Sequence, residues 1–271
     1  MKGKVYLVGA GPGDYKLLTL KGLECIKKAD VIVYDRLANK NYLKEAKENC
    51  EFIYVGKASS NHTLPQDGIN RVIADKAKEG KIVTRLKGGD PYVFGRGGEE
   101  GELLKEEGIE FEVVPGITSA IGGLCYAGIP ITHRDYASSF HVITGHLRDD
   151  DKENPEINWN ALANTNGTLV FLMGVANLQK ISSNLIKEGK SKDTPVALIS
   201  WATRSNQRVI TSTLENVYET AVRENVKPPT LIAVGDVVEL RDKLNFFETK
   251  PLFGKNVIVR STDYKDRKNR K

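Results

Sequence analysis

Short runs of β-branched and other apolar residues alternate with longer segments of helical spacing along this chain, and this alternation limits its fold more than any other feature. In the first half, the alternation predicts parallel strands joined by helical crossovers. The expected strands are residues 4–9, 31–34, 52–55, 82–86 and 111–114, and the expected helices are 17–28 and 69–78.

A second series of the same kind starts near residue 139. Its expected strands are 139–144, 168–173 and 196–200, and its expected helix is 176–187. Residues 195–201 and 209–213 flank a polar turn, which predicts a hairpin and therefore a mixed second sheet. We expect two α/β domains, residues 1–116 and 117–247, with a ligand cleft between them and a tail at 248–271.

The composition places the chain among globular proteins, because 271 residues with 40% hydrophobic content can bury a sizeable core. The start of the chain does not resemble a signal peptide, and no apolar run is long enough to span a bilayer. The three cysteines, Cys25, Cys50 and Cys125, are widely spaced, so neither a disulfide framework nor a metal knuckle is indicated. We therefore expect a cytoplasmic protein without a membrane partner.

The net charge of +5 is concentrated at one end of the chain. Residues 250–271 carry eight Lys or Arg against two Asp, a net of +6, so residues 1–249 sum to −1. A nucleic-acid-binding domain would need its basic residues on one face of the fold. The near-neutral body therefore argues against a nucleic-acid partner, and the basic tail is interpreted as a solvated end.

A glycine-rich turn at residues 9–14 follows the first expected strand, in the place where a dinucleotide-binding fingerprint would lie. The last position of that fingerprint requires Gly or Ala, and this chain has Asp14 there. Pro12 also has no N–H to offer to a phosphate. The turn is equally compatible with a structural and a ligand-binding role.

Two charged residues follow expected strands at the edge where parallel sheets bind ligands. Asp35 comes directly after residues 31–34, and its alternatives to a catalytic role are a helix cap and a ribose-binding acid. Lys57 follows residues 52–55, and a surface lysine is the alternative there. Both residues are candidates for catalysis.

The segment 85–100, directly after an expected strand, is the most informative part of the sequence. It combines five glycines with Asp90, Tyr92, Phe94 and several further charges. Glycines cost conformational entropy, and a flexible linker would be rich in serine and would lack the two aromatic residues. The segment is therefore predicted to be a ligand-binding loop.

Two hydroxyl residues, Thr118 and Ser119, stand at the start of the small-residue segment 117–127, which is predicted to be a tightly packed helix. Either hydroxyl would cap that helix, and capping is compatible with ligand contact. The four histidines have no metal-ligand spacing and suggest no Ser-His-Asp order. Neither a metal site nor hydrolase chemistry is therefore indicated.

Taken in order, these motifs resemble the uroporphyrinogen-III C-methyltransferases, a branch of the S-adenosylmethionine-dependent tetrapyrrole methylases. The resemblance extends from about residue 5 to about residue 247. The motifs that carry it are residues 8–14, 34–37, 55–57, 85–100, 114–119, 128–135, 144–146, 171–174 and 240–245. It implies two α/β domains with the methyl donor held in the cleft between them, and a homodimer.

The resemblance also implies a reaction and the residues that serve it. Methyl groups would pass from S-adenosylmethionine to C2 and then C7 of uroporphyrinogen III, giving precorrin-2 and S-adenosylhomocysteine without a metal. Asp35 matches the position proposed as proton acceptor, and Lys57 matches the proton donor. The donor-binding positions are Pro12, Gly88, Gly89, Asp90, Val93, Thr118, Ser119, Met173 and Ala202.

Arginines are the expected partners of the substrate, because uroporphyrinogen is a polycarboxylate and the guanidinium fork pairs with carboxylates in a bidentate manner. The candidates lie in or beside the motifs and are Arg36, Arg85, Arg96, Arg134 and Arg148, of which Arg36 and Arg134 rank first. An ordinary surface position is the alternative for each of them.

The end of the chain departs from the family pattern. Residues 251–260 resemble the opening strand of uroporphyrinogen-III synthase. The natural protein is therefore predicted to be a fusion of the two activities, and a simple C-terminal tail is the alternative.

Three other functions remain open on the sequence. A nicotinamide-dependent oxidoreductase would use the glycine turn with Asp35 as ribose acid, and NADH binding would reveal it. A non-catalytic carrier of the same fold would bind the methyl donor without turnover. An RNA methyltransferase would keep salt-dependent RNA binding after removal of residues 250–271.

Overall fold

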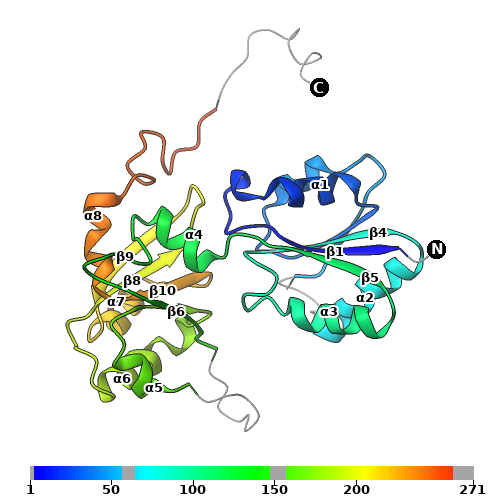
Figure 1. The fold of residues 1–271 in the computed structure, drawn as a ribbon. Coiled ribbons are helices and arrows are strands. Elements are labelled where there is room, and N and C mark those ends of the chain that lie inside the picture. Colours follow the sequence, from blue (N-terminus) through cyan, green and yellow to red (C-terminus); the bar gives the residue numbers. More distant parts are fainter. Residues whose placement is uncertain (1–2, 57–64, 147–156, 259–271) are drawn as a thin grey trace.

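The computed structural model describes residues 3–56, 65–146 and 157–258, which form two α/β halves lying side by side (Figure 1). The first half contains a five-stranded sheet whose pairings are all parallel. Its strands are β1 (Lys4–Gly9), β2 (Val31–Tyr34), β3 (Glu51–Tyr54), β4 (Ile82–Lys87) and β5 (Glu110–Val114), in the order β3-β2-β4-β1-β5. The predicted parallel sheet is confirmed, and β4 is its central strand.

Helices cover both faces of the first sheet. One face is covered by α1 (Leu20–Lys28) and the 3₁₀ helix η2 (Lys40–Glu45), and the other by α2 (Gln66–Lys78) and α3 (Gly97–Glu106). The helix predicted at 17–28 is shorter in the structure, because the Thr19 hydroxyl accepts a hydrogen bond from Gly22 N and caps α1.

The second half contains a mixed five-stranded sheet, as predicted. Its strands are β6 (Phe140–Thr144), β7 (Thr168–Leu172), β8 (Pro195–Ser200), β9 (Arg208–Thr213) and β10 (Thr230–Val234), in the order β6-β7-β10-β8-β9. β6 and β7 are parallel, whereas β10 runs antiparallel to both of its neighbours. The predicted hairpin is the antiparallel pair β8 and β9.

The second sheet is also covered on both faces. α4 (Ser119–Tyr126) packs on one face, with a core that includes Leu124, Ile199 and Leu231. α5 (Trp159–Ala163), α6 (Leu178–Lys187) and α7 (Val217–Arg223) pack on the other face. The short helices η1 (Tyr15–Leu17), η3 (Val175–Asn177), η4 (Asp236–Leu240) and α8 (Arg241–Leu244) complete the regular structure of the described residues.

Sequence reasoning assigned no element to β10, although this strand lies in the middle of the second sheet. The reason is physical: all five residues of β10 are buried, so the strand has no polar alternation, and a short apolar run cannot be told from a helix segment by periodicity. α3, α5 and α7 were likewise not assigned.

The link between the halves runs from the end of β5 at Val114 to the start of α4 at Ser119. The boundary expected between residues 116 and 117 falls in this link and stays a prediction. Residues 251–258 contain a turn but no strand, and residues 259–271 lie outside the described part, so the proposed start of a further domain also stays a prediction. Within the described ranges, no helix is long and apolar enough to cross a membrane.

Candidate active site

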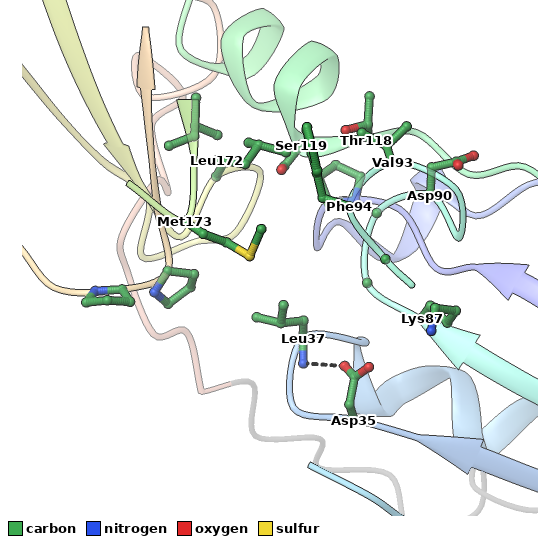
Figure 2. A pocket seen from close by; sticks show the side chains of 18 of the residues that line it. Asp35, Leu37, Lys87, Asp90, Val93, Phe94, Thr118, Ser119, Leu172 and Met173 are labelled. Carbon is green, nitrogen blue, oxygen red and sulfur yellow. Dashed lines mark hydrogen bonds between the residues drawn. The ribbon is translucent and has the colours of Figure 1, made fainter. Parts of the chain in front are cut away.

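A cavity of about 560 Å³, called the first cavity below, lies between the two halves (Figure 2). The first half contributes the residues after β1, β2 and β4 and the loop that leads into α3. The start of α4 and the residues around the ends of β7, β8 and β10 close the other side. A cavity of this volume suits a small organic ligand.

Asp35 reaches the first cavity from the end of β2. Its Oδ1 accepts a hydrogen bond from Leu37 N at 2.9 Å, so the turn after the strand fixes the side chain locally. Its Oδ2 lies 3.2 Å from Nη2 of Arg85 on the neighbouring strand β4. The carboxylate is therefore held in one orientation by two partners, and its side chain is still 25% exposed.

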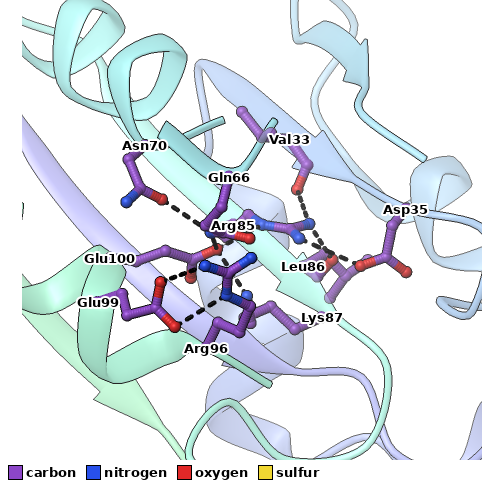
Figure 3. A network of polar contacts seen from close by, with 10 residues as sticks. All are labelled: Val33, Asp35, Gln66, Asn70, Arg85, Leu86, Lys87, Arg96, Glu99 and Glu100. Atoms are coloured by element: carbon purple, nitrogen blue, oxygen red, sulfur yellow. Dashed lines mark hydrogen bonds and ion pairs between the residues drawn. The ribbon is translucent and has the colours of Figure 1, made fainter. Parts of the chain in front are cut away.

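Arg85, Lys87 and Glu100 form a buried charge network behind Asp35 (Figure 3). Arg85 and Lys87 are two residues apart on β4 and therefore point to the same face of the sheet, where α3 carries Glu100. Glu100 Oε1 lies 3.2 Å from Arg85 Nε and 2.6 Å from Lys87 Nζ, and its side chain is 0% exposed. We call Asp35, Arg85, Lys87 and Glu100 the polar wall.

Burial and the repulsion between like charges both disfavour the charged state of Lys87 in the polar wall. Burial lowers the pKa of Lys87 below its ordinary value of 10.5, and the charge of Arg85 lowers it further against the opposing effect of Glu100. Glu100 Oε2 is buried without a hydrogen-bond partner among the described residues. Gln66 adds a longer contact of 3.4 Å to Glu100 Oε1 and donates to Asn70. Two buried cations thus depend on one buried carboxylate.

The glycine-rich loop after β4 crosses the glycine turn after β1. A Cβ on Gly9 would lie 2.5 Å from Gly116 N and 2.7 Å from Gly89 O, so only glycine fits this crossing. Asp90 fixes the loop, because its carboxylate accepts from Tyr92 N at 2.8 Å and from Gly116 N at 3.0 Å. The glycine turn therefore has a structural role, and its neighbour Pro12 lines the cavity.

Apolar side chains of the second half face the polar wall across the cavity. Leu172, Met173, Ile199 and Leu231 line this side, and we call them the apolar wall. Met173 points from the end of β7 toward the loop residues Val93 and Phe94 in Figure 2. Its side chain is 54% exposed, so its apolar surface is open to a ligand.

Several residues around the first cavity have a left-handed backbone although they are not glycine. They are Phe94, Arg96, Met173 and Trp201, with φ between 50° and 59°. Such a conformation costs roughly 1–3 kcal/mol for each residue and persists only where neighbouring contacts impose it. The cavity is thus lined by backbone whose conformation the rest of the fold determines.

The arginines at the site lie in different environments. The guanidinium of Arg36 lies over the Trp201 ring, 5.9 Å from its centroid, and that of Arg204 lies over the same ring at 5.0 Å. Arg96 is paired with Glu99. Arg85 is committed to Asp35, Glu100 and two backbone carbonyls, so its contacts position Asp35.

Most residues expected from the sequence come together at the first cavity. Its lining includes Pro12, Asp35, Arg36, Arg85, Gly88, Gly89, Asp90, Val93, Arg96, Thr118, Ser119, Met173 and Ala202. Thr118 also caps α4, since its hydroxyl accepts from Ala120 N. Arg134 is exposed and does not line this cavity, and Lys57 and Arg148 lie outside the described residues. Their roles stay predictions, as do the roles of the lining residues.

Sequence reasoning missed Lys87, Glu100, Trp201 and Arg204 as residues of the site. A signal existed for the first two, because a central parallel strand with Arg85 and Lys87 on one face needs a buried acid to compensate them. The only clue was the predicted hairpin, in which Trp201 ends a flanking strand and Arg204 lies in the turn. Their contacts depend on how the two halves meet, which a pattern along the chain does not encode.

Comparisons with known proteins agree with this geometry. The family profile "Tetrapyrrole (Corrin/Porphyrin) Methylases" matches residues 4–218. A Priestia megaterium protein named uroporphyrinogen-III C-methyltransferase is 53% identical over 236 residues, which is 87% of this chain and 98% of the relative. A Ruminiclostridium josui protein named porphyrin biosynthesis protein HemD is 49% identical over 257 residues, which is 95% of this chain and 51% of that relative.

A solved structure is similar in the same way. The uroporphyrin-III C-methyl transferase from Thermus thermophilus complexed with S-adenyl homocysteine is 39% identical, with a TM-score of 0.74 and coverage of 88% of this chain and 94% of the other. The resemblance inferred from the motifs and the two-sheet fold are both confirmed. The chain belongs to the tetrapyrrole (corrin/porphyrin) methylase family.

Proposed function

We propose that this chain is a uroporphyrinogen-III C-methyltransferase, which transfers two methyl groups from S-adenosylmethionine to C2 and C7 of uroporphyrinogen III and forms precorrin-2 by way of precorrin-1. The observation that carries the proposal is the first cavity itself, in which a fixed carboxylate, Asp35, faces an apolar wall. The names of two relatives support it, because each relative matches this chain over nearly the whole length of both proteins.

The first cavity fits the methyl donor. The donor combines an adenosine group with a charged amino acid, and the cavity combines the apolar wall with the backbone of the glycine-rich loop. Gly89 has a φ of +70°, and the nearest atom to a Cβ built there would be 3.8 Å away, so the missing side chain leaves backbone open to a ligand. Pro12, Gly88, Gly89, Asp90, Val93, Thr118, Ser119, Met173 and Ala202 would hold the donor.

The bound donor supplies an electrophilic methyl group on a good leaving group, so the protein acts chiefly by alignment. Asp35 is the proposed acceptor of the proton that the substrate loses after methylation, because it is the fixed carboxylate at the cavity. Arg85 is a positioning residue that holds Asp35. Lys57 is the proposed proton donor.

The proposed substrate contacts are charged. Arg36 and Arg96 line the first cavity, and their guanidinium groups would pair with substrate carboxylates. Arg134 is proposed for the same role on the strength of its motif alone. Arg85 contributes positive charge to the site, although its hydrogen bonds are directed to Asp35, Glu100 and the backbone.

The setting of the enzyme is also part of the proposal. We place it in the cytoplasm, because Cys25, Cys50 and Cys125 are all free thiols, and we assign it no nucleic-acid or membrane partner. A homodimer is proposed, since an isologous pair is the commonest assembly. The fusion with a uroporphyrinogen-III synthase is also proposed, and the R. josui relative, of which this chain covers 51%, is an example of a longer protein that contains a matching part.

The test is anaerobic incubation with enzymatically generated uroporphyrinogen III and S-adenosylmethionine, with product mass and absorbance as readouts. Two successive methyl additions are expected. The Asp35→Ala variant should methylate about 10²- to 10⁴-fold more slowly, the usual range for a lost acid–base group, while S-adenosylhomocysteine binding by calorimetry is retained. Donor binding without methylation of this substrate would refute the substrate assignment and leave the family unchanged.

A further inference from the structure

A second cavity, of about 750 Å³, opens beside the first one. It lies between the residues after β1 and β2 in the first half, the loop between β8 and β9 in the second half, and the segment after α8. The two cavities share Arg36 and Arg204 in their linings. A ligand that fills the first cavity and extends past these two arginines would therefore enter the second.

The charged residues that line the second cavity are mostly positive. Its lining contains Arg36, Lys40, Arg204 and Lys250, and Asp14 is the one carboxylate among its described lining residues. Asp14 is already engaged, because Oδ1 accepts from Lys16 N at 2.9 Å and Oδ2 accepts from the Tyr126 hydroxyl at 3.0 Å. The lining thus carries a net charge of +3 and faces an open cavity.

The four cations lack acidic partners in the part of the chain that the structure describes, where no carboxylate oxygen lies within 4.0 Å of them. Arg204 Nη2 donates to Leu37 O at 2.8 Å, and burial, followed by the charge of Arg36, lowers the pKa of Arg204. Lys250 lies 5.0 Å from the centroid of the Phe247 ring. Cations arranged in this way are available to an anion from outside the protein.

The wall that the C-terminal segment adds to the second cavity is firmly anchored. Glu248 accepts hydrogen bonds from Gln207 at 2.9 Å and from Asn245 at 3.3 Å, and it pairs with Arg241. The Phe247 ring lies 4.7 Å from Tyr126 and 5.3 Å from Phe253 by ring centroids. Lys250 is therefore carried by a fixed segment, although it lies beyond the methylase motifs of the sequence.

We propose that the second cavity is a carboxylate subsite, in which Lys40 and Lys250 together with the shared Arg36 and Arg204 bind the acidic side chains of the substrate rings that are not being methylated. The inference rests on the proposed function, because it takes uroporphyrinogen III as the ligand of the first cavity. Because the first cavity would also hold the methyl donor, the distal rings of the substrate need such an extension, and pairing their acids with cations fixes which ring faces the donor.

Single and double variants Lys40→Gln and Lys250→Gln test the subsite. The matched controls are Lys44→Gln, on the same 3₁₀ helix as Lys40, and Lys255→Gln, five residues after Lys250; neither residue lines either cavity. Each test variant should raise KM for uroporphyrinogen III about threefold and the double variant about tenfold, the size expected for partly solvated ion pairs. The Kd of S-adenosylhomocysteine by calorimetry should stay at the wild-type value.

A binding measurement separates failure of the subsite from failure of the proposed function. Uroporphyrinogen III is titrated anaerobically while tryptophan fluorescence is followed, because both shared arginines lie over the Trp201 ring and no turnover is needed. Weaker binding in the double variant than in a control that combines Lys44→Gln and Lys255→Gln supports the subsite even if no methylation occurs. Equal KM and equal binding in test and control variants would overturn it, as would absence of binding to the wild type.

Discussion

The two walls of the first cavity are built on opposite principles. The polar wall comes from the parallel sheet and holds four charged side chains, of which Arg85 and Lys87 are 5% exposed and Glu100 is 0% exposed. The apolar wall comes from the mixed sheet and contains no charge, and its most prominent member, Met173, is 54% exposed. The polar wall is fixed by internal pairing, whereas the apolar wall offers the exposed Met173 to a ligand.

This difference separates the residues that stabilise the fold from those that would bind a ligand. Changes in the polar wall should act on folding first, because each buried charge depends on another. In the apolar wall, Ile199 and Leu231 belong to the buried core, whereas a change of Met173 should act on ligand affinity first, since this exposed residue contributes little to the folded state before a ligand arrives.

Glu100→Gln should break the polar wall. The substitution leaves Arg85 and Lys87 buried with no full negative charge between them, and loss of one partner of a buried pair typically costs about 3–5 kcal/mol. Urea denaturation should report a loss of this size in the free energy of unfolding. Glu106→Gln, on the exposed face of the same helix α3, is the control and should change it by less than about 0.5 kcal/mol. Equal losses in the two variants would mean that the network does not stabilise the fold.

Lys87 should make stability rise with pH. Its pKa in the folded protein is below the ordinary 10.5, so between the two values the unfolded chain binds more protons and the free energy of unfolding increases as pH rises. Lys87→Met lacks this contribution, whereas the exposed lysines titrate alike in both proteins and cancel. The stability of wild type relative to Lys87→Met should therefore grow as pH rises toward 10.5, by about 1.4 kcal/mol for each unit of pKa difference. A constant or shrinking difference would contradict the burial effect.

Met173→Ala should leave the fold intact and weaken the donor. The exposed side chain adds apolar contact only when a ligand covers it, and losing about half of a methionine's burial corresponds to roughly 1.4 kcal/mol, or about tenfold in Kd. Calorimetry with S-adenosylhomocysteine measures this loss, and thermal denaturation without ligand should be unchanged. A change in thermal denaturation without a change in Kd would contradict the predicted difference between the two walls.

The two halves also differ in how well the sequence predicts them. In the first half, alternating apolar runs locate all five strands, because parallel strands separated by helices give a regular pattern. In the second half, the buried run of β10 carries no periodicity and was not assigned. Hydrophobic periodicity therefore predicts alternating parallel strands and helices well, and it predicts a fully buried central strand poorly.

Prediction of the site residues from the sequence has the same limit. Asp35, Asp90 and Thr118 stand in motifs next to strand or helix ends, so their position at the cavity follows from local sequence. Glu100 and Arg204 act through partners that are distant in the chain, at Lys87 and Leu37, and only the packing of α3 and the approach of the two halves brings them together. Residues whose role depends on a tertiary partner therefore cannot be predicted from local sequence patterns.

The smallest expected effect is that of Thr118→Ala, which tests whether Thr118 only caps its helix or also contacts the ligand. Thr19 and Thr118 both cap a helix through the side-chain hydroxyl, but Thr118 lines the first cavity and Thr19 does not. Each change to alanine should cost about 1 kcal/mol in the free energy of unfolding. Only Thr118→Ala should also weaken S-adenosylhomocysteine binding, by about threefold to tenfold if a single hydrogen bond is lost. Equal donor affinity in the two variants would assign Thr118 to capping alone, and the donor would then be held on that side by backbone and apolar contacts.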